Sequence, residues 1–157
     1  RFLIATICTI FLVRSQIFQL NKQEFYGAIL CGFFLFTGYA FQNFGLWENE
    51  FYTSTTPSKS AFITSISIVM VPIMLVVTGI QKVSSRIWTA IILAIIGLYL
   101  LLDPTGSGIS LGDMFTFGCA TCFAIHIILQ DRYAKKGIHI TLFFLIQVTS
   151  VTIFSFI

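Results

Sequence analysis

Charged side chains are scarce in this sequence. Only 10% of its 157 residues are charged, whereas 57% are apolar, 16% are aromatic and the mean hydropathy is +0.94. A soluble domain carries about 25% charged residues. The composition therefore excludes an ordinary soluble domain and predicts a chain that lies in a lipid bilayer.

The short motifs of common catalytic sites are also missing. The sequence contains no G-x-S-x-G, no G-x-x-x-x-G-K-[ST] and no H-E-x-x-H pattern. No nucleophile can be named together with a base and a third group that orients it. We therefore predict that the protein is not an enzyme and needs no cofactor. A membrane-embedded enzyme that uses His126 is the alternative.

Six apolar runs follow one another along the chain, separated by short charged or glycine- and proline-containing breaks. They cover residues 1–13, 25–47, 53–80, 87–102, 114–129 and 138–157, and most approach the roughly 20 residues that a helix needs to cross the hydrocarbon core. The runs lack the polar and apolar alternation of barrel strands, and lipid requires backbone groups to be hydrogen-bonded internally. The predicted fold class is all-α, a polytopic transmembrane helix bundle with six spans.

Basic residues fall into alternate breaks. The breaks after the first, third and fifth runs hold Arg14, Lys22, Lys82, Arg86, Arg132, Lys135 and Lys136. The other two breaks hold acidic residues, namely Glu48, Glu50, Asp103 and Asp113. This positive-inside pattern predicts that the first run crosses inward and that both ends lie toward the outer side. It also explains the net charge of +3, so no nucleic-acid partner is predicted.

The four cysteines lie inside apolar runs, where they behave as small hydrophobes. Cys119, Cys122 and His126 share one helical face at i, i+3 and i+7, and are metal-ligand residue types. A tetrahedral site would need a fourth ligand, and His139 is the only other histidine. Close helix packing by small residues is the favoured alternative, so no metal site is predicted.

Small and polar residues form stripes along three of the runs. The stripes are Gly38, Gln42 and Gly45; Ser60, Thr64 and Ser67; and Ala90, Ala94 and Gly97. Each stripe suits close packing of helices. Gln42 differs because an amide at membrane depth must find a partner or face water. For Gln42 a cavity-facing role and a packing role both stay open.

Two prolines interrupt the run over residues 53–80. Pro57 and Pro72 each remove a backbone donor, and Pro72 also leaves the carbonyl of Ile68 without its usual partner. We expect this run to bend most easily and assign both prolines to a hinge or helix break. An ordinary first-turn proline is the alternative for Pro57.

Several segments resemble one known family. They are "GYAFQNFGLWENEFYTSTTPSKSAFITSISIVMVPIM", "WTAIILAIIGLYLLL" and "GDMFTFGCATCFAIHIILQDRYAK". Together they are similar to the EamA-like bacterial branch of the drug/metabolite transporter (DMT) superfamily. The shared features are the G-Y-x-x-Q helix, the Y-T-S-x-x-x-S-K segment with its V-P ending, and the G-D that opens a later helix.

The resemblance implies ten helices in two inverted five-helix repeats, with a substrate cavity between the halves. Residues 1–103 would hold helices two to five of the first repeat, and residues 104–157 would hold helices six and seven. The chain opens with an arginine and closes inside an apolar run, so we expect an internal fragment. The implied protein is a multi-pass exporter or exchanger of small metabolites or drugs in the inner (plasma) membrane, working by alternating access. A structural or receptor-like membrane subunit is the alternative.

Lys59 is the most informative charged residue. A helix that began near Thr53 would carry it about 9 Å below the membrane boundary, against the positive-inside pattern. It could snorkel outward and pair with Glu48 or Glu50. However, Lys59 is part of the Y-T-S-x-x-x-S-K segment through which this chain resembles the EamA-like branch.

We therefore expect Lys59 to face a cavity beside Gln42 and Tyr39, and to attract an anionic or carboxylate-bearing small molecule. The other expected substrate contacts are Phe62, His126 and Gln147. Ionisable and amide groups at membrane depth more often face the bundle than the lipid, although a hydrogen bond to a neighbouring helix is the alternative for His126. A coupling proton or a counter-substrate is a further expected partner.

Overall fold

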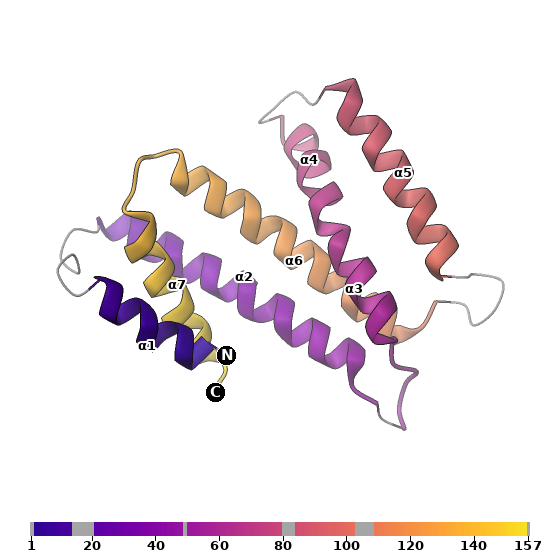
Figure 1. Ribbon diagram of the computed structural model, residues 1–157, viewed down its shortest axis with the longest axis horizontal. Helices are drawn as coiled ribbons and strands as arrows, with labels where there is room; N and C mark the ends of the chain where they lie inside the picture. Colours follow the sequence, from indigo (N-terminus) through magenta and orange to yellow (C-terminus); the bar gives the residue numbers. More distant parts are fainter. Residues whose placement is uncertain (1, 14–20, 49, 80–83, 103–108, 157) are drawn as a thin grey trace. The chain divides into compact units, whose positions relative to one another are not determined.

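The computed structural model describes residues 2–13, 21–48, 50–79, 84–102 and 109–156. Within these ranges every regular element is an α-helix, and the described part contains no strand (Figure 1). The helices are α1 (Phe2–Val13), α2 (Lys22–Leu46), α3 (Pro57–Ser65), α4 (Ser67–Val77), α5 (Ser85–Leu102), α6 (Leu111–Ala134) and α7 (Ile140–Phe154). The prediction of an all-α fold is confirmed.

Among the residues that the structure describes, three helical segments are long and apolar enough to cross a membrane. They are α2, the combined segment Pro57–Val77, and α6. Shorter apolar helices cover Phe2–Phe11, Ser85–Gly97 and Ile140–Phe154. Six crossings were expected from the sequence, and those of the three shorter helices remain predictions.

The third apolar run begins its helix later than expected. The sequence places the start near Thr53, but α3 begins at Pro57. Thr56 is extended, with φ −80° and ψ 151°, as the residue before a proline prefers. Its hydroxyl accepts a hydrogen bond from the backbone N–H of Lys59 at 3.3 Å. Pro57 therefore occupies the first helical turn, where its missing N–H does not weaken the helix.

The same run is interrupted at Ile66, which separates α3 from α4. The backbone N–H of Ile66 bonds to the carbonyl of Ile63 at 3.1 Å, a tighter turn than an α-helix makes. Pro72 lies inside α4, and its ring crowds the carbonyl of Ile68, one turn earlier. The interruption lies next to that carbonyl, in the segment where the sequence predicts a bend.

The described chain forms two compact units. The terminal unit comprises Arg1–Thr37 and His126–Ile157, and the central unit comprises Gly38–Ile125. In the terminal unit α1 packs along α7 (Figure 1), with Val13, Leu142 and Leu145 buried together. The predicted repeat boundary between residues 103 and 104 lies outside the described residues and stays a prediction.

Glycines allow α2 and α6 to approach each other closely within the central unit. A Cβ atom on Gly38 would lie 2.4–2.6 Å from the ring of Phe123, too near for any real side chain. One on Gly45 would lie 2.6 Å from the hydroxyl of Thr116 and 2.8 Å from the carbonyl of Gly112. The packing role predicted for this glycine stripe is confirmed.

Threonines within the helices commonly bond to the carbonyl four residues earlier in the same helix. Examples are Thr37 to Phe33 at 2.8 Å, Thr121 to Phe117 at 3.0 Å and Thr149 to Leu145 at 2.8 Å. These hydroxyls are hydrogen-bonded without water. The helix surfaces thereby stay compatible with an apolar environment.

Candidate functional site

Lys59 lies in the first turn of α3 and is half-buried. The helix start assumed for its expected depth is wrong, because only two helical residues precede it, and the depth itself stays a prediction. Its positive charge acts on the carboxylate of Asp113, at the start of α6. The structure thus relates Lys59 to an acidic residue that the sequence analysis treated only as a loop charge.

Asp113 is the centre of a buried hydrogen-bond network. Its side chain is buried, with 4% of its surface exposed, and accepts a hydrogen bond from the hydroxyl of Thr55. The backbone N–H of Ser110 donates to its other carboxylate oxygen at 3.0 Å, and the Ser110 hydroxyl accepts from the N–H of Asp113 at 3.1 Å. The reciprocal bonds form a capping box. The S-x-x-D spacing could have revealed this role in the sequence.

Backbone bonds hold the α2–α3 loop against the start of α6. The N–H of Thr55 donates to the carbonyl of Gly45 at 2.8 Å. The N–H of Gly112 donates to the carbonyl of Thr53 at 3.1 Å. The loop is thereby tied to the end of one long helix and the beginning of another. This arrangement brings Thr55 to the carboxylate of Asp113.

A second group of polar side chains lies further along α3. The Gln42 amide donates to the Thr64 hydroxyl at 3.3 Å, and the Cys119 thiol interacts with the same threonine. Ser60, one turn before Thr64, is 1% exposed, and its hydroxyl has no hydrogen-bond partner within the described residues. A buried unbonded hydroxyl is a candidate ligand contact, because it is otherwise unfavourable.

Tyr39 and Phe62, the aromatic residues expected at the site, both have neighbours that the structure describes. Tyr39 meets Phe123 edge-on, with ring centroids 5.2 Å apart. Phe62 is two residues from Ser60 and from Thr64, which places it on another face of α3. It lines an apolar groove of about 420 Å³ against α5, together with Ser65, Ile66, Val69, Leu93, Ala94 and Gly97. Their contact with a substrate stays a prediction.

His126 and Gln147 form a separate polar pair in the terminal unit. They lie on α6 and α7, and the nitrogen of the Gln147 amide is 3.2 Å from Nε2 of His126. The other ring nitrogen, Nδ1, lies 3.1 Å from the carbonyl oxygen of Cys31 on α2. His126 therefore lies within hydrogen-bond distance of two neighbouring helices, α2 and α7, which is the alternative that the sequence analysis left open for this residue.

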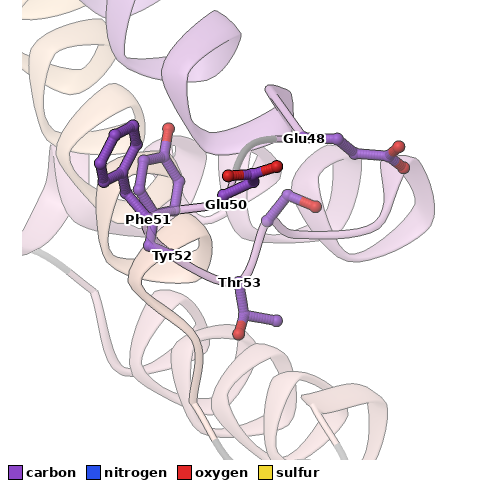
Figure 2. A pocket seen from close by; sticks show the side chains of 6 residues that line it. Glu48, Glu50, Phe51, Tyr52 and Thr53 are labelled. Carbon is purple, nitrogen blue, oxygen red and sulfur yellow. The ribbon is translucent and has the colours of Figure 1, made fainter.

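An open hollow of about 450 Å³ lies on the α2–α3 loop. Figure 2 shows the side chains that surround it: Glu48, Glu50, Phe51, Tyr52, Thr53 and Ser54. The two glutamates are exposed. The hollow is a surface feature of the loop, and its acidic residues alone do not define a site.

No group of three histidine, cysteine, aspartate or glutamate side chains that could hold a metal occurs in the part of the chain that the structure describes. Both ring nitrogens of His126 are already within hydrogen-bond distance of protein atoms. Cys119 and Cys122 are buried in α6, where small side chains suit close packing.

The fold and its buried polar groups define an all-helical chain with helices of membrane-spanning length. No family model matches the chain, and no solved structure matches it. An "Uncharacterized transporter" from Archaeoglobus fulgidus is 30% identical over 116 residues, which are 74% of this chain and 35% of that protein. The chain thus spans about a third of the length of this relative.

Proposed function

We propose that the protein is an integral membrane secondary transporter of small metabolites or drugs, of the EamA-like drug/metabolite type. It works by alternating access within a ten-helix inverted-repeat architecture and is a multi-pass protein of the inner (plasma) membrane. The similarity to a transporter and the three helices of membrane-spanning length support this proposal. The segments that resemble the EamA-like branch support the finer assignment.

The observation that carries the proposal is the presence of two ionisable groups, one buried and one half-buried, at the starts of apolar helices. Asp113 is buried, and its carboxylate feels the charge of the half-buried Lys59. A single charge at membrane depth costs about 2.5 to 3.5 kcal/mol on insertion scales, and such charges usually mark a substrate or ion path. A purely structural subunit has no need of ionisable groups in these positions.

The substrate we propose carries a carboxylate or another anionic group. Such a group is attracted by the positive charge of Lys59, which also acts on the carboxylate of Asp113. The buried Ser60 hydroxyl has no hydrogen-bond partner within the described residues, and we assign it a polar contact with another part of the substrate. The Gln42 amide, bonded to Thr64 one turn further along, supplies a polar contact for the rest of the molecule.

Comparing the culture media of cells tests this function. Metabolites are profiled in the medium of cells that lack the full-length gene and of cells that overproduce the protein. We expect one or more carboxylate-bearing compounds to accumulate with the wild type. Lys59→Met keeps the side-chain length and removes the charge, so it should reduce this accumulation to the level of the deletion strain.

Lys135→Met is the matched control, because it removes a lysine that forms an exposed ion pair with Asp131 at 2.6 Å. Such surface pairs contribute little, so this variant should export normally. Immunoblots of the membrane fraction check that all proteins are present in equal amounts. An unchanged medium in the wild-type overproducer would contradict transport and favour a structural or receptor-like subunit. Full export by Lys59→Met would remove the lysine from the site.

A further inference from the structure

His126 is held by hydrogen bonds that define its charge and its tautomer. The ring is buried, with 8% of its surface exposed. The Cys31 carbonyl can only accept, so Nδ1 carries the proton in that 3.1 Å contact. An amide nitrogen can only donate, so Nε2 of the ring accepts from Gln147 at 3.2 Å. This arrangement describes a neutral imidazole whose basic nitrogen is Nε2.

Gln147 has an unused acceptor beside this nitrogen. The residue is 1% exposed, and its amide oxygen, Oε1, has no hydrogen-bond partner within the described residues. A buried polar atom without a partner is unfavourable, so its presence requires an explanation. Rotating the Gln147 amide by half a turn exchanges the positions of its nitrogen and its oxygen. Oε1 would then lie where it accepts a hydrogen bond from a protonated Nε2.

No described charge on the neighbouring helices provides another partner for a protonated ring. α7 contains no titratable residue. The titratable group of α2 nearest in sequence to the contact is the Cys31 thiol itself, and the charged residues of α2, Lys22 and Glu24, lie in its first turn. On α6, Cys122 precedes His126 by one turn, and the Gln130 side chain, one turn later, also hydrogen-bonds to the ring. The charged residues Asp131 and Arg132 follow, and Asp131 is paired with Lys135. Neutral groups, namely the carbonyl of Cys31 and the amides of Gln130 and Gln147, are thus the partners that would stabilise the proton.

We propose that His126 is a proton-binding site in the membrane interior and that Gln147 is the side chain that turns to hold the proton. A hydronium ion gives its proton to the lone pair of Nε2 and leaves as water, the amide turns, and the Nδ1 bond to Cys31 remains. Histidine suits this role because its unperturbed charge change lies between pH 5 and 8. Its use as the coupling proton of transport rests on the proposed function, whereas proton binding does not.

Nitrogen NMR of the full-length protein, labelled with 15N-histidine in detergent micelles, tests the site without any substrate. His126→Gln identifies the signals of His126, and the exposed His139 serves as a reference within the same sample. At neutral pH we expect the tautomer with the proton on Nδ1. On acidification we expect the doubly protonated ring.

Gln147→Leu should remove the doubly protonated signal over the pH range in which the wild type shows it. Gln147→Glu places a carboxylate there and should retain that signal to higher pH, so it decides the question if the leucine variant does not fold. Thr149→Val is the control, because its hydroxyl bonds to Leu145 of its own helix, and it should behave as the wild type. A proton on Nε2 at neutral pH, or protonation unaffected by both Gln147 variants, would overturn the proposal. Since no transport is measured, this result is independent of the proposed function.

Discussion

At the scale of single residues, the network around Asp113 is the feature that sequence reasoning missed. The carboxylate was counted as an outer loop charge, because topology rules consider only where charges fall along the chain. Its burial depends on Thr55, which is 58 positions earlier in the chain. A contact over that separation has no local signal, whereas the S-x-x-D capping box has one.

Replacing Thr55 by valine tests this network. The change keeps the side-chain shape and removes the hydroxyl that donates to Asp113. We expect a loss of about 1–3 kcal/mol in the free energy of unfolding, because a buried carboxylate loses a partner. Thermal or denaturant unfolding of the purified protein in detergent measures the effect.

Thr37→Val provides the comparison for this experiment. The Thr37 hydroxyl bonds to the carbonyl of Phe33 in its own helix, so its loss should change stability by only a few tenths of a kcal/mol. Equal losses in the two variants would show that the Thr55 bond adds nothing beyond an ordinary helical threonine.

At the scale of the helices, the approach of α6 to its neighbours depends on Gly112. A Cβ atom there would lie 2.6 Å from the carbonyl oxygen of Gly45 and 2.7 Å from the carbonyl carbon of Ser54. These are backbone atoms on α2 and on the α2–α3 loop, which cannot turn away as a side chain can. Gly112→Ala should therefore destabilise the protein by about 1–3 kcal/mol.

Gly118→Ala, on the same helix, should have the opposite effect. Its Cβ atom would lie 3.4 Å from the ring of Phe41, a contact to a side chain that can shift slightly. Alanine is favoured over glycine in a helix interior by about 0.5–1 kcal/mol. Unfolding curves of both variants show whether each substitution raises or lowers the free energy of unfolding. An unchanged stability of Gly112→Ala would refute the close contact.

The sequence predicts helices better than it predicts their ends. The run over residues 25–47 corresponds to α2 (Lys22–Leu46), and the run over residues 138–157 contains α7 (Ile140–Phe154). For the run over residues 53–80, the predicted start of the helix was wrong. Thr53 and Thr55 pair through their backbones with α6 and α2 instead of entering a helix. Hydropathy measures the side chains and is insensitive to such backbone pairing.

In the candidate site, too, helical spacing predicts some features and misses the contacts between helices. Gln42 and Thr64 belong to stripes read from helical spacing, and the structure joins them by a hydrogen bond. Phe62 does not share their face, as its spacing from Ser60 already indicated. The pairing of His126 with Gln147 joins residues on different helices, and periodicity along one helix carries no information about partners on another.

At the scale of the whole molecule, the distribution of basic residues predicts the topology. Reporter fusions at Lys22, Gln81 and Lys135 should be cytoplasmic, and fusions at Asn49 and Ser107 should be exported. Asn49, Gln81 and Ser107 lie outside the described residues, so the fusions test the pattern independently of the structure. A cytoplasmic signal at Asn49 would overturn both the topology and the family placement.

The threonines that bond to their own helices affect how easily those helices can slide. A helix that keeps the partners of its hydroxyls within itself, as at Thr37, Thr121 and Thr149, can rotate against a neighbour without exposing an unbonded group to lipid. Resistance to such motion is then concentrated in the few hydrogen bonds that cross between elements. In the central unit these include the bonds of Thr55 to Asp113 and of Gln42 to Thr64. The rate at which α3 can shift should therefore depend on how fast these two bonds break.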